Sequence, residues 1–195
     1  MRRKTFDMIL TAGGAVLVVV LLAAGSLGLW GYSYANSNVH DQLAQQQIFF
    51  PPLGNAALAS PKIGPYLNQY AGEQLLTGPQ AEAYANHFIA VHLSEMPFGG
   101  VYAKASAASM AAPTDTKLTG EVNTIFKGTT LRGLLLEAYA FWTIGQVALV
   151  GAIVSFVLAG VMLMLTLLGM LHFRRVPEDL EFPHPHKVEK VLETV

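Results

Sequence analysis

The feature that most constrains this chain is an apolar stretch of 36 residues, from Ala138 to Phe173, that contains no Asp, Glu, Lys or Arg. As an α-helix it would extend about 54 Å, whereas the hydrocarbon core of a bilayer is about 30 Å thick. Arg174 and Arg175 follow it, and about twenty residues measured back from Arg174 are enough to cross the bilayer. We therefore expect a transmembrane helix whose apolar outer part, from about Ala138 to Val150, continues beyond the bilayer and must be covered.

A second apolar stretch, residues 8 to 31, also lacks charged residues and would extend about 35 Å as a helix. Basic residues at positions 2 to 4 precede it, opposed only by Asp7, which predicts a cytoplasmic N-terminus. The alternative is a signal peptide cleaved near residues 33 to 35, where Ser-Tyr-Ala has the small-x-small pattern. The apolar region of a signal peptide has only about 7–15 residues, so the length favours an uncleaved anchor.

Arginines after the second span place the C-terminus in the cytoplasm as well. The segment between the spans carries five Lys and Arg against seven Asp and Glu, so it lacks the positive charge that retains a loop in the cytoplasm. We expect an all-α plasma-membrane protein in which two transmembrane helices flank a helical extracytoplasmic domain. Its parts are a cytoplasmic N-terminus (1–7), a first transmembrane helix (8–31), the extracytoplasmic domain (32–137), a second transmembrane helix with an apolar extension (138–173) and a cytoplasmic tail (174–195).

Composition excludes several classes of function. The chain is 52% hydrophobic and 13% charged, which is typical of a membrane protein. A net charge of -1 argues against nucleic acid as a partner. Without cysteine there is no disulfide, thiolate zinc site or ordinary iron–sulfur cluster. Neither span has an ionisable residue at its centre, so we expect no ion pathway within this chain, and we expect no cofactor.

The segment between the spans has helical signals separated by proline and glycine. Residues 53 to 78 indicate an irregular loop with short turns. Four helices are expected: one capped at Asn36, Ser37 or Asn38 and ended by Pro51-Pro52, one from Gly78-Pro79 to Met96, one over 101–111 and one over 116–126. Thr129 or Thr130 would then cap a helix that continues into the second span.

Small residues recur along the second span at alternating spacings of three and four. Because small residues let helix backbones approach closely in lipid, this pattern predicts a helix-packing seam. Its partner would be the first span, which offers Gly14, Ala24 and Gly28, or another subunit. The alternative is that Ala and Gly are simply common in membrane helices. The seam consists of Gly145, Ala148, Ala152, Ser155 and Ala159.

The stretch HFIAVHLSEM, residues 87 to 96, contains two histidines and a carboxylate among aliphatic residues. On an α-helical wheel His92 falls within an apolar face, and His87 lies about 140° away. We interpret His92 as a core residue that contacts Glu95. The alternative is a metal site on His87, His92 and Glu95, which His40 would complete. The apolar face is Ala81, Tyr84, Ala85, Phe88, Ile89, Val91 and Met96.

The remaining polar candidates have simpler interpretations. His184 and His186 lie in a charged, proline-containing tail and are expected to be solvated. His172 lies at the inner membrane edge, and Gln146 is expected at an interface rather than in a transport path. No Gly-x-Ser-x-Gly motif of a serine hydrolase occurs.

Two segments, TGPQAEAYANHFIAVHL (77–93) and KGTTLRGLLLEAYAFWTIG (127–145), resemble a family of small actinobacterial two-span membrane proteins. Members are sometimes labelled aromatic ring-opening dioxygenase. The resemblance implies an accessory place beside the respiratory cytochrome bcc–oxidase supercomplex. A non-haem iron dioxygenase needs two histidines and a carboxylate that converge on one metal. The helical wheel argues against such convergence for His87 and His92.

The sequence therefore predicts a non-enzymatic accessory or assembly subunit of a larger cell-envelope membrane complex. Its expected partners are membrane lipid and other membrane-protein subunits, with cytochrome bcc or oxidase subunits implied by the resemblance. Two alternatives stay open at this point. One is a metal-dependent enzyme that uses His87, His92 and Glu95, and the other is an extracytoplasmic domain that binds an apolar ligand between its helices.

Overall fold

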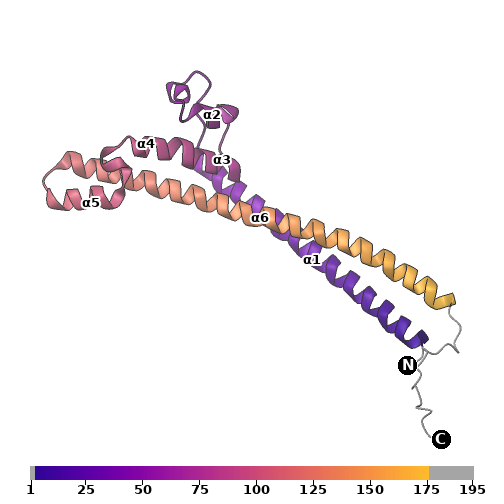
Figure 1. Ribbon diagram of the computed structural model, residues 1–195. Coiled ribbons are helices and arrows are strands. Elements are labelled where there is room, and N and C mark those ends of the chain that lie inside the picture. The colour runs from indigo at the N-terminus through magenta and orange to yellow at the C-terminus, as the bar shows by residue number, and fades with distance from the viewer. Residues whose placement is uncertain (1–2, 176–195) are drawn as a thin grey trace, which may run out of the picture. The chain divides into compact units, whose positions relative to one another are not determined.

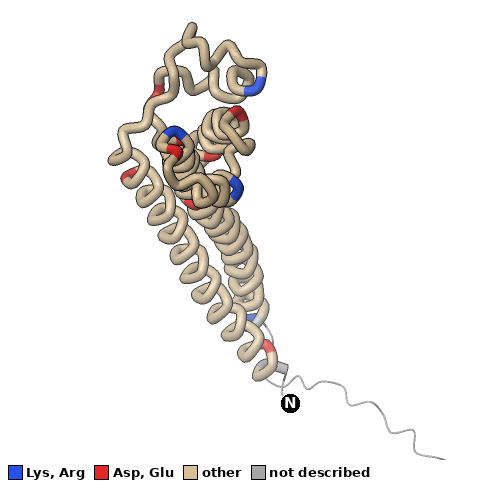
Figure 2. The backbone as a smooth tube through the Cα atoms, turned by 90° about the vertical axis from the view of Figure 1, so that its left-hand side faces the viewer, with Lys and Arg blue, Asp and Glu red and all other residues tan. Residues whose placement is uncertain are grey.

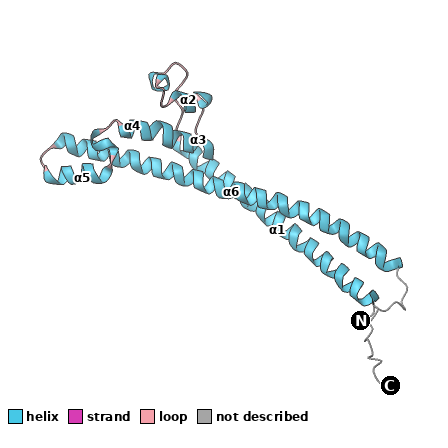
Figure 3. Cartoon of the chain, in the orientation of Figure 1, coloured by secondary structure: helices cyan, strands magenta, loops and turns pink. Residues whose placement is uncertain are grey.

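The computed structural model describes residues 3–175, and these residues are mostly helical (Figures 1 and 3). Within them the one extended pairing is an isolated bridge between Phe49 and Gln74. The elements in order are α1 (Arg3–Gln46), η1 (Ala56–Ala59), α2 (Gly64–Leu67), η2 (Asn68–Tyr70), α3 (Gly78–Ala83), the π-helix η3 (Tyr84–Ile89), α4 (Ala90–Ser94), η4 (Pro97–Gly100), α5 (Tyr102–Ala111) and α6 (Thr116–Arg175).

Two of these helices, α1 and α6, are long and apolar enough to cross a membrane. The expectation of a helical protein with two candidate spans is therefore confirmed at this level. The chain divides into two compact units. We call residues 1–27 together with 151–195 the paired-helix unit, and residues 28–150 the central unit.

The long helices do not break where the sequence predicted caps. Asn36, Ser37 and Asn38 lie inside α1, and Thr129 and Thr130 lie inside α6. The preference of Asn, Ser and Thr for cap positions contributes less free energy than burial of the apolar residues that flank them. The buried positions Ala35, Val39 and Leu43 continue the helical spacing through the expected break, and Asn38 accepts a hydrogen bond from Gln42 one turn on.

The end of α1 and the start of α6 carry residues that commonly end or begin a helix. After α1, Gln47 has a left-handed backbone with φ of 53°, and Pro51 and Pro52 follow. At the start of α6, a carboxylate oxygen of Asp115 accepts a hydrogen bond from the backbone N–H of Leu118 at 3.0 Å. Such a contact caps the first turn.

The core of the central unit is built by the loops as well as the helices. Phe50, Leu67, Leu75 and Ile125 are fully buried. The backbone N–H of Phe50 donates to Glu73 O at 2.9 Å, and that of Leu75 donates to Ile48 O at 2.8 Å, which ties two loop segments together. Apolar side chains of the loop are thereby held against α3 and α6.

Helix α3 begins at a capping box. The Thr77 side chain accepts from the N–H of Gln80, and the Gln80 side chain accepts from the N–H of Thr77 at 3.0 Å. Gln80 is buried, and its amide also donates to a carboxylate oxygen of Glu73 at 2.9 Å. Next to this cap, Gly78 packs directly against the ring of Trp142, where no Cβ would fit.

In the paired-helix unit, α1 and α6 approach closely. A Cβ added to Gly14 would lie 2.6 Å from Thr166 Oγ1, and one added to Gly25 would lie 2.9 Å from Phe156. Charged residues occur only near the ends of the described helices of this unit (Figure 2). Packing at small residues is the arrangement expected for helices in lipid. The prediction that Ala24 would be a packing residue of the first span was wrong, because Ala24 is exposed. Its neighbour Gly25 is buried instead, seven residues after the buried Val18.

The seam residues lie on the less exposed side of α6. Gly145, Ala152 and Ala159 are buried, and Ala148 and Ser155 are half-buried. In the central unit, a Cβ on Gly145 would lie 2.9 Å from Ala35 Cβ. In the paired-helix unit, Ala152 and Ala159 share a seven-residue spacing with Thr166, which contacts α1 at Gly14.

The seam generates a first prediction. Ala152 is 2% exposed and Val157 is 61% exposed. Ala152→Leu should lower the free energy of unfolding in detergent by about 1–3 kcal/mol, because the larger side chain separates the two backbones. Val157→Leu, which adds bulk on the outer side, should change it by less than about 0.5 kcal/mol. Equal stability of the two variants in denaturant titrations would contradict the seam.

Candidate functional site

The predicted helix over HFIAVHLSEM is interrupted by a π-helix. Residues Tyr84–Ile89 form η3 between α3 and α4. A π-helix has more residues per turn than an α-helix, so spacings of four, rather than an average of 3.6, keep side chains on one face. The packed positions follow this spacing: Ala81, Ala85 and Ile89 are buried, and Leu93 contacts Gly128 of α6.

The prediction that His92 is a core residue was therefore wrong. His92 is exposed, because the π-helix shifts the packed position by one residue and Leu93 takes it. Its Nδ1 donates to the carbonyl oxygen of Phe88 at 2.7 Å, and its ring lies 4.5 Å from the Phe88 ring between centroids. Glu95 is also exposed, and it is the C-cap of α4 rather than a partner of His92.

His87 has a different environment, which the sequence did not predict. Its ring stacks on Tyr66, with 3.5 Å between ring centroids and an interplanar angle of 5°. His87 is half-buried and Tyr66 is exposed, so the stack lies at the surface of the central unit. Tyr66 belongs to α2 in the irregular loop, and the stack therefore fixes that loop to the π-helix.

The structure does not bring the candidate metal ligands together. Among residues 3–175 there is no group of three or more His, Asp or Glu side chains that could hold a metal ion. His40 lies on α1, where its Nδ1 is 3.1 Å from a carboxylate oxygen of its neighbour Asp41. The set of His87, His92 and Glu95, completed by His40, is thus not assembled in the described part of the chain.

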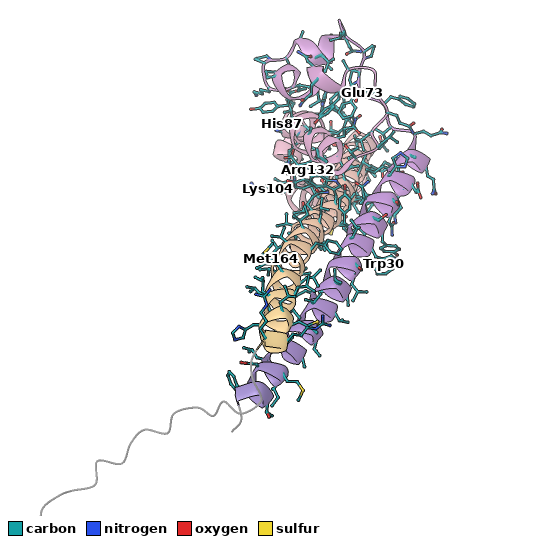
Figure 4. All side chains as sticks on the ribbon, turned by 90° about the vertical axis from the view of Figure 1, so that its right-hand side faces the viewer. Trp30, Glu73, His87, Lys104, Arg132 and Met164 are labelled. Atoms are coloured by element: carbon teal, nitrogen blue, oxygen red, sulfur yellow. The ribbon has the colours of Figure 1, made fainter. Side chains whose placement is uncertain are left out.

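A polar chain that sequence reasoning missed joins the π-helix to α6. A guanidinium nitrogen of Arg132 donates to Asn86 Oδ1 at 2.9 Å. The amide nitrogen of Asn86 donates in turn to a carboxylate oxygen of Glu82 at 2.7 Å. Figure 4 labels Arg132 and His87, which both lie in the central unit. The Asn86–Glu82 contact has the i, i+4 spacing of a helix, but the contact to Arg132 depends on tertiary packing.

Aromatic rings fill the space between the loop and the π-helix. Tyr84 lies 5.4 Å from Phe50 in an edge-to-face arrangement and 4.7 Å from Phe88 in a stack, measured between centroids. Burial raises the pKa of Tyr84 above its ordinary value of 10.0. The phenol is therefore protonated at neutral pH, and we assign this cluster to packing.

One side of α6 in the central unit carries large apolar side chains that none of the residues 3–175 covers. On the other side, Leu135 is buried and Trp142 packs on Gly78. The uncovered residues are exposed by at least a third of their surface, and Val147 by 67%. We call this set the outer face; it consists of Leu134, Phe141, Ile144, Val147 and Val150.

A groove of about 410 Å³ adjoins the outer face between α1 and α6 in the central unit. Leu134 and Phe141 belong to both the groove and the outer face. The side chains of Asn38, Gln42, Gln46 and Glu137 give part of the groove a polar lining. Apolar residues with polar neighbours are the usual composition of a protein–protein contact surface.

The remaining candidates from the sequence fall in three places. Gln146 is half-buried, and His172 is exposed near the end of α6. His184 and His186 lie outside the described residues. The seam residues lie along α6 as described above.

Comparisons with known proteins give no relative. No protein-family model, no curated protein and no solved structure matches the chain.

The histidines generate a second prediction. His92→Ala should change the free energy of unfolding by less than about 0.5 kcal/mol, because His92 is exposed. His87→Ala should lower it by about 0.5–1.5 kcal/mol through loss of the stack on Tyr66. Denaturant titration of both variants measures the difference. Elemental analysis is the control: one equivalent of iron or zinc in the wild-type protein, lost in both variants, would contradict this assignment and restore the metal site.

Proposed function

We propose that this chain is a two-span membrane protein that serves as an accessory or assembly subunit of a larger cell-envelope membrane complex. The observation that carries the proposal is the outer face of α6. Its five large apolar side chains, from Leu134 to Val150, have no cover within the described part of the chain. Apolar surface of this kind, bordered by a groove with a polar lining, is typical of a contact with another protein.

The position of the outer face along α6 distinguishes a protein partner from lipid. About twenty residues preceding Arg174 suffice to cross a bilayer. The outer face is formed by residues that precede this segment, so most of it would meet water if no protein covered it. Covering the exposed part of these side chains would favour association, because burial of apolar surface contributes about 25 cal/mol per Å².

The charge pattern supports an orientation with both termini in the cytoplasm. Basic residues lie at positions 2 to 4 before the first span and at Arg174 and Arg175 after the second. The central unit would then be extracytoplasmic, and the outer face would contact the exposed part of a neighbouring membrane protein.

The respiratory cytochrome bcc–oxidase supercomplex is the partner that we propose. Its support is the resemblance of residues 77–93 and 127–145 to actinobacterial two-span proteins. These segments include α3, the π-helix and the part of α6 that carries most of the outer face. The second of these segments therefore overlaps the surface that we assign to the partner.

Orientation gives a third prediction, and the absence of native cysteine makes it simple to test. A cysteine at Met110, which is 74% exposed in the central unit, should react with a membrane-impermeant thiol reagent on intact cells. A cysteine at Thr194 should react only after lysis. The cysteine-free wild type controls for labelling of other proteins. Labelling of Thr194→Cys in intact cells would reverse the proposed topology.

The outer face gives a fourth prediction. After extraction in a mild detergent, the wild-type chain should co-purify with cytochrome bcc and oxidase subunits, identified by mass spectrometry and by haem absorbance. Ile144→Ser with Val147→Ser should reduce their yield at least about tenfold, because two apolar contacts are lost. Serine has a helix propensity similar to those of isoleucine and valine, so α6 itself should be retained.

The control for this experiment is Leu53→Ser, which changes an exposed leucine of the loop outside the outer face. It should leave the yield of the partners unchanged. Absence of any enriched membrane protein with the wild type would contradict an accessory role. Enrichment of a different membrane complex would support an accessory role but contradict the proposed partner. Equal yields of the partners with the wild type and the double variant would show that the outer face is not the contact surface.

A further inference from the structure

The paired-helix unit contains a second groove, and its lining is almost entirely apolar. It has a volume of about 490 Å³, within the range of about 300–1,000 Å³ that is usual for ligand sites. It lies along the first turns of α1 and the last turns of α6. The lining includes Thr11, Gly13 and Gly14 of α1 and Met162, Thr166 and Gly169 of α6, and its other side chains are aliphatic.

The two polar side chains of this groove are already engaged. Thr11 Oγ1 donates to the carbonyl oxygen of Asp7 at 2.8 Å. Thr166 Oγ1 donates to the carbonyl oxygen of Met162 at 2.7 Å. Because neither hydroxyl proton is free, the lining offers no unused hydrogen-bond donor to a polar ligand. The chemistry of the groove therefore favours an apolar chain.

Glycine produces the open space in this groove. A Cβ added to Gly13 would meet no atom within 4 Å, so a larger residue there would extend into empty volume. Gly14, the next residue, instead allows Thr166 to approach α1 closely. Gly14 thus allows α1 and α6 to pack closely, whereas Gly13 leaves the groove unfilled. The groove can be filled by substitution at Gly13 without disturbing the contact at Gly14.

Two basic residues follow the groove along α6. Arg174 and Arg175 are exposed at the end of α6, and Arg174 lies five residues after Gly169, or about 7.5 Å along the helix. Asp7 is the only acidic residue among the described residues of this unit. Arginines at the cytoplasmic surface attract anionic lipid headgroups, by about 1 kcal/mol for each residue.

We propose that this groove binds one acyl chain of an anionic phospholipid, whose headgroup lies beside Arg174 and Arg175. An apolar groove followed by a pair of exposed cations matches a molecule with an acyl chain and an anionic head. The proposal rests on the membrane location in the proposed function, but it does not depend on the protein partner. A side chain from a neighbouring helix would fill the groove equally well, but it would leave the adjacent arginines without a counterpart.

The experiment uses the full-length protein, purified in detergent and analysed by native mass spectrometry. Dioleoylphosphatidylglycerol or dioleoylphosphatidylcholine is added in turn, and the fraction of protein that retains one lipid is compared. The wild type should retain phosphatidylglycerol about tenfold more strongly than phosphatidylcholine. Equal retention of the two lipids by the wild type would overturn the proposal without reference to any variant.

Two variants test the two parts of the site. Gly13→Leu should reduce retention of both lipids at least about tenfold, because its side chain occupies the groove. Replacing glycine by leucine inside a helix also favours the helix, so folding should be preserved. Arg174→Gln with Arg175→Gln should leave phosphatidylcholine unchanged and remove the preference for phosphatidylglycerol.

The matched control is Gly160→Leu. A Cβ at Gly160 likewise meets no atom within 4 Å, and Gly160 does not line the groove. It should retain lipid as the wild type does, and equal losses in Gly13→Leu and Gly160→Leu would overturn the proposal. Failure of the membrane location would show separately, as protein in the soluble fraction before detergent is added.

Discussion

A helix that crosses a bilayer must satisfy its peptide groups within itself, because hydrocarbon offers them no other partner. Proline would break this requirement, and none of the ten prolines lies within α1 or α6. Both helices are consequently uninterrupted over 44 and 60 residues. The cap signals inside them have no effect, because the apolar positions on either side continue to be buried along the same helix.

Two such helices can pack only if their backbones come close, since water does not drive apolar faces together in lipid. The contacts of Gly14 with Thr166 and of Gly25 with Phe156 are close approaches of this kind. The large side chains of the paired-helix unit point outward, and Val157 and Leu165 are more than half exposed. In a soluble protein this distribution would be unstable. It is the expected distribution where lipid is the solvent.

The sequence predicted these features because they depend on composition and on spacing along one helix. The absence of charge in the spans, the length of the second span and the position of its small residues can all be read directly from the residues. Of the three small residues offered in the first span, Gly14 contacts Thr166 and Gly28 is half-buried, whereas Ala24 is exposed. The seven-residue spacing from Val18 to Gly25 determines burial instead.

The candidate site around HFIAVHLSEM could not be predicted to the same degree. A wheel drawn at 100° per residue assumes an unbroken α-helix, and the π-helix at Tyr84–Ile89 shifts every later position. For this reason Leu93, rather than His92, occupies the packed position against α6. The contacts from Tyr66 to His87 and from Arg132 to Asn86 join different elements of the fold. No local pattern specifies them.

Lipid and protein partners place different demands on the same apolar side chains. Lipid chains are fluid and adapt to the contour of a helix, so an apolar face inside the bilayer needs no complementary partner. An apolar face in water does need one, because water is its alternative environment. The outer face and the side of α6 that we assign to lipid contain the same residue types, chiefly Leu, Ile, Val and Phe. Distance along α6 from Arg174, rather than side-chain chemistry, therefore decides which residues we assign to lipid and which to protein.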